Sequence, residues 1–322
     1  MATTRAVTVA CAALVAVAAV GAIIVVRSSE SASTTPTTVA SARATNPFRT
    51  GHVLVIPHGG GDGLFPEDTM LAYDRTIAMG ADMVDVDLRL SSDGVVIDFH
   101  DNTVDRMTGT SGNVGAMSFA DLATLDAGYT FSPTETPANS AVSGAPSDPL
   151  HPFRGIGVRI PSFESVLQRF PNVPISIDLK DESTKMIAPV CSLLVRYHRV
   201  NDVFVGSNSD DQILQFRKDC PAVRTSATLA DVIASRNAEA AGSTTFVPAV
   251  FVDQPPFRRN GQELVDATSL TWAHEHGVAI MPWVVNDEAD MKLLIGLGVD
   301  AIYTSYPDVL LRLLGRCTAA CG

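Results

Sequence analysis

The chain has few charged side chains and is short of basic ones. Only 18% of its 322 residues are charged, and 23 Lys and Arg stand against 35 Asp and Glu, which gives a formal net charge of -12. Binding to nucleic-acid phosphates needs a basic face, so this balance predicts no nucleic-acid partner. The hydrophobic content of 46% is too high for a disordered chain. We therefore expect a folded protein with another kind of partner.

Two common motifs are also missing. No Gly-x-Gly-x-x-Gly opens a helix after the first expected strand, at 53–58, which weakens the case for a dinucleotide-binding fold. No Cys-x-x-Cys spacing indicates a zinc site. Four cysteines lie outside the N-terminal apolar run, an even number that suits an oxidising compartment. We expect Cys191 to pair with Cys220 and Cys317 with Cys321, and buried free thiols are the alternative.

The N-terminus carries the one long apolar run. Residues 6–26 are uncharged, lie between Arg5 and Arg27, and can cross a hydrocarbon layer of about 30 Å as a helix. We therefore interpret residues 1–27 as a signal anchor or a cleaved signal peptide, and residues 28–46 as a Ser/Thr/Ala-rich linker. In both interpretations the domain at 47–322 is exported. It is either anchored through an uncleaved segment, outside the cytoplasm, or secreted.

From residue 53 onward, short β-branched runs alternate with helix-length amphipathic stretches. This alternation is typical of βαβ units and a parallel sheet. Eight strands are expected, at 53–58, 83–90, 175–180, 203–208, 223–227, 249–254, 279–286 and 301–307. Helices are expected at 69–79, 184–197, 211–218, 229–241, 262–276, 288–297 and 308–314. Eight strands in about 275 residues predict a (β/α)8 TIM barrel, with a doubly wound open sheet as the alternative.

Two insertions interrupt this repeat. Residues 95–101 follow the second strand after only four residues, too few for a parallel crossover, so they should form the second arm of an antiparallel hairpin. Residues 128–161 are rich in Pro, Ser, Thr and Gly and are expected to form a long surface loop able to cover a site.

Three carboxylates are expected to face the barrel interior. Residues two apart on a strand share a face, so Asp85 and Asp87 point together, and Asp178 and Lys180 do the same on a later strand. Unpaired ionised carboxylates are costly in such an interior, and a hard divalent cation is the simplest remedy. A buried salt bridge, of Asp178 with Lys180 or Asp87 with Arg89, is the alternative.

Two histidines close strands. His58 ends the first strand before three glycines, and His100 ends the hairpin arm and precedes Asp101. Catalytic groups of barrel enzymes stand at the carboxyl ends of strands. Because histidine transfers protons near neutral pH, the pair predicts acid–base chemistry beside the carboxylates.

Several of these segments, in this order, resemble the glycerophosphodiester phosphodiesterase family. They are PHGGG at 57–61, PEDT at 66–69, GADMVDVDLRLSSDGVVIDFHD at 80–101, ISIDLK at 175–180, PWVVN at 282–286 and AIYTSYPD at 301–308. The resemblance covers roughly 52–314. It implies a (β/α)8 barrel with a hairpin insertion, and a metal-dependent hydrolase that splits glycerophosphodiesters into glycerol 3-phosphate and an alcohol.

The resemblance also implies roles for particular residues. His58 and His100 match the two catalytic histidines, and Asp85, Asp87 and Asp178 match the ligands of one divalent cation, Ca²⁺ or Mg²⁺. The implied substrate contacts are Glu67 of the PEDT motif and Lys180 near the phosphate. Trp283, at the end of the seventh expected strand, would supply an apolar wall for the glycerol or its substituent, and a plain core Trp is the alternative. The implied partner is a small-molecule or lipid phosphodiester, and no protein partner is predicted.

Three positions depart from the family pattern. Gly59 stands where the family usually has Arg after the first catalytic histidine, which removes a bidentate phosphate donor. Asp85 and Asp178 stand where Glu is common, and each is one methylene shorter. Asp68 replaces Asn, and either residue can cap the following helix. These changes bear on phosphate affinity and metal preference.

Three functions remain open at this point. The first is an exported, metal-dependent phosphodiesterase that acts on glycerophosphodiesters, or on lysophospholipids to give a lysophosphatidic acid. The second is a catalytically weak envelope barrel that binds phosphodiester or polyol ligands, motivated by the missing Arg. The third is a sphingomyelinase D-like phospholipase, against which Pro66 to Thr69 argue.

Overall fold

The computed structural model describes residues 46–133, 150–181 and 183–317. The predicted export segment and nearly all of the linker, the middle of the long loop and Cys321 lie outside these ranges. Within them, no helix is both long and apolar enough to cross a bilayer.

Eight parallel strands form the centre of the molecule. They are β1 (Leu54–Pro57), β2 (Val84–Leu90), β4 (Ile175–Leu179), β5 (Val203–Gly206), β6 (Arg224–Thr225), β7 (Val252–Asp253), β10 (Ala279–Ile280) and β11 (Ala301–Thr304). Each falls inside one of the eight segments expected from the sequence, although β6, β7 and β10 are shorter than expected.

Backbone hydrogen bonds join these strands into a ring. Strands β2, β4, β5 and β6 pair in that order, β7 pairs with β10, and β11 pairs with β1. A parallel bridge from Ser226 to Val252 links β6 to β7. Two further bonds complete the ring, from Asp300 N to Ile280 O (3.0 Å) and from Asp82 N to Val55 O (3.0 Å). The predicted (β/α)8 barrel is thereby confirmed.

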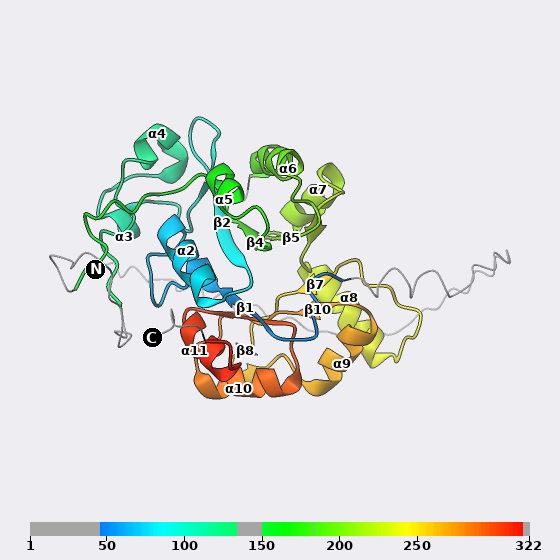
Figure 1. Ribbon diagram of the computed structural model, residues 1–322. Helices are drawn as coiled ribbons and strands as arrows, with labels where there is room; N and C mark the ends of the chain where they lie inside the picture. Colours follow the sequence, from blue (N-terminus) through cyan, green and yellow to red (C-terminus); the bar gives the residue numbers. More distant parts are fainter. Residues whose placement is uncertain (1–45, 134–149, 182, 318–322) are drawn as a thin grey trace, which may run out of the picture.

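Helices surround the ring (Figure 1), with α5, α6 and α7 on one side and α9, α10 and α11 on the opposite side. The outer helices are α2 (Met70–Met79), α5 (Phe163–Arg169), α6 (Ile187–Arg196), α7 (Asp210–Asp219), α8 (Leu229–Ala240), α9 (Ala267–Glu275), α10 (Glu288–Leu297) and α11 (Pro307–Leu313). Most begin at a side-chain cap: Thr69 Oγ1, for example, accepts from Ala72 N at 3.2 Å.

One helix prediction needs correction, and one helix of the structure was not predicted. The helix expected over 262–276 begins only at Ala267, because Asp266 caps it, and Gln262–Glu263 instead form strand β9 beside β8 (Arg258–Arg259). Helix α5 was not expected, although Ser162 Oγ accepts from Ser165 N at its start. A single-turn helix η3 (Thr184–Met186) precedes α6.

The hairpin after β2 forms as predicted. Strand β3 (Val96–Asp98) pairs with β2 antiparallel, and Leu88 lies opposite Asp98. Two short helices, α3 (Asp105–Thr108) and α4 (Phe119–Leu122), and the single turn η2 (Val114–Ala116) follow it.

The barrel interior changes from apolar to polar along the strands. Phe48, Met83 and Phe204 fill the end where the strands begin, and the rings of Phe48 and Phe204 meet edge-to-face at 4.9 Å. Further along the same strands stand Asp85, Asp87 and Gly206. The apolar plug closes the barrel interior at this end, so the polar interior opens at the carboxyl ends of the strands.

The described parts of the long loop pack on the side of the barrel. Phe153 is buried and meets Phe65 and Phe131 edge-to-face. None of the loop's described residues lines the cavity described below. The middle part of the predicted cover, residues 134–149, lies outside the described residues.

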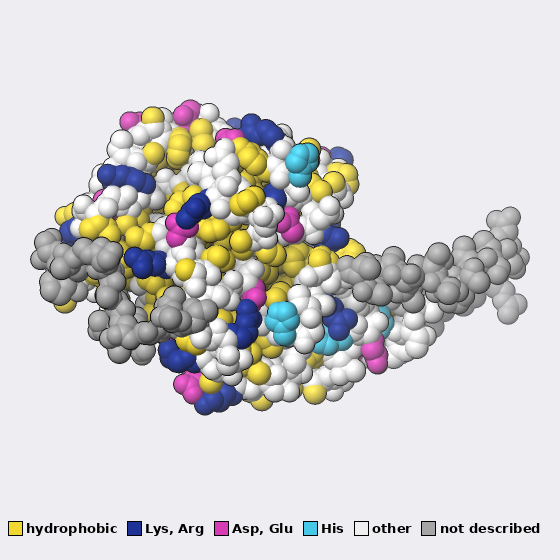
Figure 2. Space-filling view, in the orientation of Figure 1, with side chains coloured by type: hydrophobic (Ala, Val, Ile, Leu, Met, Phe, Trp, Pro, Cys, Tyr) yellow, Lys and Arg dark blue, Asp and Glu magenta, His cyan; other side chains and the backbone are white. Residues whose placement is uncertain are grey.

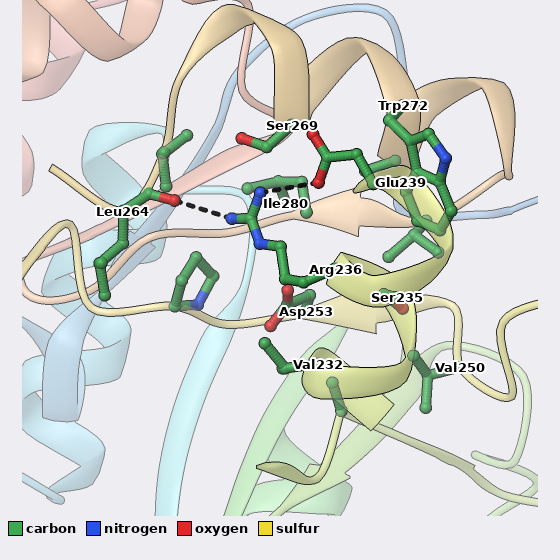
Figure 3. Close-up of a pocket in the computed structure, with 15 residues that line it drawn as sticks. Val232, Ser235, Arg236, Glu239, Val250, Asp253, Leu264, Ser269, Trp272 and Ile280 are labelled. Atoms are coloured by element: carbon green, nitrogen blue, oxygen red, sulfur yellow. Dashed lines mark hydrogen bonds and ion pairs between the residues drawn. The ribbon is translucent and has the colours of Figure 1, made fainter. Parts of the chain in front are cut away.

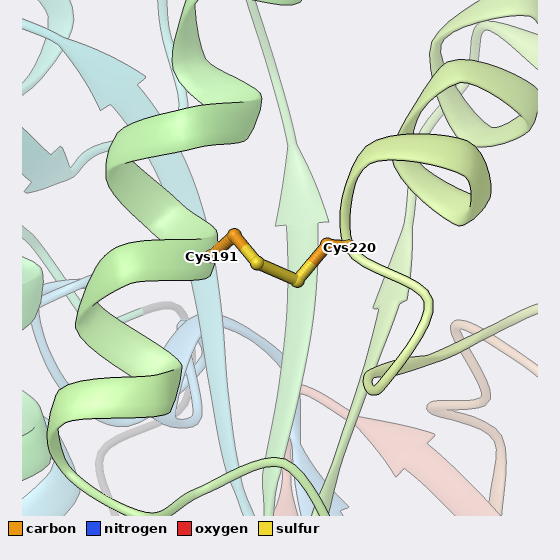
Figure 4. The surroundings of a disulfide bond; sticks show 2 residues. All are labelled: Cys191 and Cys220. Atoms are coloured by element: carbon orange, nitrogen blue, oxygen red, sulfur yellow. A yellow bond between two sulfur atoms is a disulfide. The ribbon is translucent and has the colours of Figure 1, made fainter.

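One predicted disulfide is present. Cys191 on α6 is bonded to Cys220 at the end of α7, which ties two neighbouring outer helices together (Figure 4). Cys317 is also disulfide-bonded. Its predicted partner, Cys321, lies outside the described residues.

Figure 2 shows one face of the molecule, on which acidic and basic side chains are interspersed. The acidic excess of the sequence therefore does not form a single patch on this face.

Candidate active site

The charged residues singled out in the sequence meet in one cavity of about 290 Å³ at the carboxyl ends of the strands. Seven of the eight predicted site residues line it: His58, His100, Asp85, Asp87, Asp178, Lys180 and Trp283. The other lining residues are mostly neutral and polar, among them Ser176, Asn208, Ser226, Gln254 and Tyr303. The cavity thus has a charged side and an uncharged, hydrogen-bonding side.

His58 stands directly after β1, on the single-turn helix η1 (His58–Gly60). The turn needs glycine: Gly60 has φ +84°, and a Cβ there would lie 2.8 Å from Cβ of Ala72. Nδ1 of His58 lies 3.2 Å from Oδ2 of Asp62. Although burial opposes protonation, the carboxylates of Asp62, Asp85 and Asp87 outweigh it and raise the pKa of His58 to about 9.

His100 reaches the cavity through the hairpin. Phe99 N donates to Asp87 O at 2.6 Å, and the carbonyl of His100 accepts from Arg89 Nη2 at 2.6 Å. Nδ1 of His100 lies 2.8 Å from Oδ1 of Asp101. Both cavity histidines therefore have a carboxylate at Nδ1, as proton-transfer histidines in enzymes often do.

The buried carboxylate of Asp98, on β3, holds the hairpin against helix α2 and strand β2. Asp98 accepts from the hydroxyl of Tyr73 at 2.6 Å and from Asp87 N at 2.9 Å. Asp98 is not among the predicted site residues, because its partners Tyr73 and the Asp87 amide lie on other elements and leave no local sequence signal.

Lys180 lies between two of the three predicted metal ligands. Its Nζ is 2.7 Å from Oδ2 of Asp178 and 3.2 Å from Oδ1 of Asp87, residues that are opposite each other in the β2–β4 register. The salt bridge of Asp178 with Lys180, which the sequence left open, is present. Arg89 does not pair with Asp87, since its Nη1 donates instead to Asp181 at 2.9 Å.

Burial and neighbouring charge disfavour the ionised carboxylates. Burial, reinforced by Asp85 and Asp178 and opposed by Lys180, raises the pKa of Asp87 to about 7. Burial also raises the pKa of Asp85, against the opposing effect of His58 and of Gly59 N, which donates to Asp85 Oδ2 at 3.1 Å. This cost would be relieved by a second positive charge close to Lys180.

The donor set fits a hard divalent cation. All three side chains offer oxygen ligands, and the buried Oδ1 of Asp178 has no hydrogen-bond partner among the described residues. No three acidic, His or Cys side chains in the described ranges are already arranged as a metal-ligand group. Asp178 nevertheless offers one carboxylate oxygen that no other described residue engages.

Glu67 has a different neighbour from the one the resemblance implied. It is absent from the side chains that line the cavity, and its Oε1 accepts a hydrogen bond from Arg106 Nη2. Glu67 also lies beside Gly59, where a Cβ would be 3.2 Å from Glu67 Cβ. A longer side chain at position 59 would thus meet Glu67 first.

Asp68 adopts a left-handed conformation, with φ +53°, and is fully buried. Neither of its carboxylate oxygens has a hydrogen-bond partner among the described residues. Burial, together with the charges of Asp87, Asp98 and Glu67, raises the pKa of Asp68 well above its usual range. It does not cap α2, because Thr69 does.

The uncharged side of the cavity contains a network that sequence reasoning missed. The hydroxyl of Tyr303 lies 2.9 Å from Ser176 Oγ and accepts from Gln254 Nε2 at 2.6 Å. Indole Nε1 of Trp283 donates to the carbonyl of Gln254 at 2.6 Å. The strand alternation placed Ser176 inward, but nothing in the sequence linked it to residues so far along the chain.

An eight-stranded parallel barrel with histidines, carboxylates and a lysine at the carboxyl ends of its strands defines a barrel enzyme. Residues 58–309 match the model of the glycerophosphoryl diester phosphodiesterase family, so the chain belongs to this phosphodiesterase family.

Individual relatives and a solved structure are similar to this chain over most of its length. The chain is 29% identical over 282 residues to a glycerophosphodiester phosphodiesterase of Bacillus subtilis, covering 85% of this chain and 90% of the relative. It is 25% identical over 280 residues to a human lysophospholipase D, covering 79% and 82%. The glycerophosphoryl diester phosphodiesterase domain of a Mycobacterium tuberculosis protein shares the fold, with a TM-score of 0.68 at 21% identity over 82% of this chain and 99% of that domain.

Proposed function

We propose that this protein is an exported, divalent-cation-dependent phosphodiesterase that hydrolyses glycerophosphodiesters, or lysophospholipids, to glycerol 3-phosphate or a lysophosphatidic acid and an alcohol. The observation that carries the proposal is the meeting of two carboxylate-bound histidines, a lysine and three carboxylates in one cavity. The names of the two relatives support the two substrate classes.

The two histidines divide the proton transfers. One takes the proton of the attacking hydroxyl, and the other gives a proton to the leaving alkoxide. The carboxylate at each Nδ1 orients the ring so that Nε2 is the reacting nitrogen. The attacking hydroxyl is either water or the substrate's own glycerol hydroxyl, the second route passing through a cyclic phosphate.

Lys180 supplies fixed positive charge beside the phosphate. Its two carboxylate partners raise its pKa above the usual range, although burial opposes this, so it remains protonated throughout the neutral range. Asp85, Asp87 and Asp178 would hold a Ca²⁺ or Mg²⁺ ion. When bound, the cation neutralises phosphate oxygens and orients the attacking group.

Trp283 is placed to contact the glycerol or its substituent. Its side chain is 43% exposed at the cavity, while its Nε1 is held by the Gln254 carbonyl. A large apolar ring fixed at one edge presents a rigid face to a ligand.

Export is supported by cysteine chemistry. The Cys191–Cys220 bond and the bonded state of Cys317 suit an oxidising compartment. Together with the apolar segment at 6–26, they favour a domain outside the cytoplasm, anchored or secreted. Mass spectrometry of the mature N-terminus distinguishes the two: an intact segment in the membrane fraction means an anchor, and a start near residue 43 means secretion.

The central experiment measures glycerol 3-phosphate released from glycerophosphocholine, and lysophosphatidic acid released from lysophosphatidylcholine, with Ca²⁺, Mg²⁺ or chelator. We expect cation-dependent turnover that falls by about 10²–10⁴-fold in His58→Ala and His100→Ala. The matched control is His198→Ala, which changes an exposed histidine that does not line the cavity. Turnover that persists in the presence of chelator and in His100→Ala would contradict the mechanism.

The binding-barrel alternative is tested by the same protein. If no substrate turns over but Ca²⁺ or Mg²⁺ raises the unfolding temperature of the wild type, and not of Asp178→Asn, the barrel binds without catalysis. The missing Arg at position 59 is the feature that favours this alternative.

A further inference from the structure

Arg106 joins two parts of the chain, one of which is the residue that follows His100. It lies on the short helix α3, and its guanidinium donates from Nε to Asp101 Oδ2 at 2.6 Å and from Nη2 to Glu67 Oε1. Glu67 is 39 residues earlier in the chain and three residues before the start of α2. One planar group thus bridges two carboxylates from separate loops.

Asp101 connects this bridge to His100. One oxygen of Asp101 accepts from Arg106, and the other lies 2.8 Å from Nδ1 of His100. With both oxygens engaged, the carboxylate cannot turn without losing a charge-assisted bond. The order of contacts is Arg106, then Asp101, then His100, and His100 lines the cavity.

The side chain of His100 depends on this support. Its backbone carbonyl is held by Arg89, but its ring is 44% exposed and the Asp101 contact decides which nitrogen carries the proton. A proton on Nδ1 leaves Nε2 bare toward the cavity. A freely rotating Asp101 would let the ring change both orientation and tautomer.

Glu67 provides the second anchor. It accepts from Arg106, and Gly59 next to it brings no positive charge of its own. The charge that balances Glu67 therefore comes from Arg106. This anchor fixes the direction in which Nε of Arg106 approaches Asp101.

We propose that Arg106 is a positioning residue that acts on His100 through Asp101, keeping Nδ1 of His100 as donor and Nε2 open to the substrate. The proposal rests on the proposed role of His100 in proton transfer. Arg106 itself touches neither the cavity nor the reacting atoms.

A surface ion pair without this role would behave differently. Arg106 is 53% exposed, and pairs so exposed contribute little to stability. Replacing Arg106 should therefore leave the unfolding temperature nearly unchanged, whether Arg106 positions His100 or only forms a surface ion pair. Only the positioning role predicts a loss of turnover.

The first experiment is a double-mutant cycle on the full chain with Arg106→Gln and Asp101→Asn. We expect each single variant to lower kcat by about 10- to 100-fold with KM changed less than about threefold, because the substrate still binds but the histidine is misoriented. The kcat of the double variant should be no lower than that of the slower single variant, because both substitutions act on His100 through the same contacts.

The controls are Arg106→Lys and Arg196→Gln. One ammonium cannot reproduce the two fixed directions of the guanidinium, so Arg106→Lys should restore little of kcat. Arg196 is similarly exposed and pairs with Glu164 on the outer helices, so Arg196→Gln should keep wild-type kcat. Unchanged kcat in Arg106→Gln, a loss wholly in KM, or multiplied losses in the double variant would overturn the proposal.

The second experiment does not need turnover. Imidazole ¹⁵N shifts of His100, assigned with His100→Gln, should show protonated Nδ1 in the wild type and a mixture of tautomers in both Arg106→Gln and Arg106→Lys. An unchanged Nδ1-protonated population in these variants would overturn the proposal. If the wild type hydrolyses no substrate, the proposed function fails while this measurement still decides the role of Arg106.

Discussion

Lys180 Nζ lies 2.7 Å from Oδ2 of Asp178, two residues earlier on the same side of the chain. Asp87, on the neighbouring strand, is the second partner at 3.2 Å. The ammonium is therefore the positive charge that the carboxylates hold in this structure. A cation and a phosphate would both have to be accommodated around it.

Replacing Lys180 with Met keeps the length of the side chain and removes its charge. We expect kcat/KM for glycerophosphocholine to fall by about 100-fold or more, because a fixed positive charge beside the phosphate is lost. Lys185→Met is the control, since that lysine is exposed on η3. Wild-type kcat/KM in Lys180→Met would show that the lysine serves only the carboxylates.

His58 should titrate near pH 9 in cation-free protein, which histidine NMR in the presence of chelator can follow. Burial alone would lower its pKa, and the carboxylates of Asp62, Asp85 and Asp87 raise it to about 9. Because the folded pKa lies above the unfolded one, the stabilisation from protonated His58 is complete below about pH 6.5 and is lost as the pH rises through about 9.

Asp62→Asn should move this titration to lower pH, because it removes the carboxylate at Nδ1. Asp121→Asn, an exposed change on α4, is the control and should leave it unchanged. A His58 titration that does not move in Asp62→Asn would contradict the assignment of Asp62 as its partner.

The Cys191–Cys220 bond should stabilise the fold measurably. It closes a loop with a sequence separation of 29 residues, which corresponds to about 3–4 kcal/mol in the chain-entropy account. We expect the double variant Cys191→Ala, Cys220→Ala to lose free energy of unfolding of this order in urea. Because both cysteines lie on outer helices, kcat should hardly change; a large loss of kcat with intact stability would contradict this.

Asp253 should make stability fall as the pH rises. It lies in a small pocket between β7, α8 and α9, beside Arg236, whose guanidinium is held by Glu239 and the carbonyl of Leu264 (Figure 3). Burial, opposed in part by Arg236, raises the pKa of Asp253 to about 6. The folded state binds this proton more tightly than the unfolded state, so stability is lost between about pH 4 and pH 6.

Asp253→Asn removes the ionising group. Relative to the wild type, its free energy of unfolding should improve from pH 4 to pH 8 by up to about 3 kcal/mol. Asp211→Asn, an exposed change on α7, should show no such trend. Parallel pH profiles for wild type and Asp253→Asn would contradict a raised pKa of Asp253.

Much of the fold followed from local patterns. The β-branched runs located all eight barrel strands, and the short connection after Leu90 predicted the hairpin. Boundaries failed where a cap or a pairing partner decided them, as at Asp266, whose capping box starts α9 later than the periodicity suggested.

The sequence by itself determined which side chains share a strand face. Asp85 and Asp87 point together, as do Asp178 and Lys180, because the side-chain period of a strand is two residues and needs no distant partner. The glycines after His58 and the His100–Asp101 pair are likewise local, and so is the family resemblance they carry.

Only the tertiary structure decided which of these faces meet. The register that sets Asp87 opposite Asp178, the bond of Tyr303 to Ser176, and the bridge of Arg106 to Glu67 join residues far apart in the chain. Such contacts depend on how the barrel closes and where its loops pack. The sequence carries no periodic signal for either, so it supplied the chemical groups while the closed barrel supplied their partners.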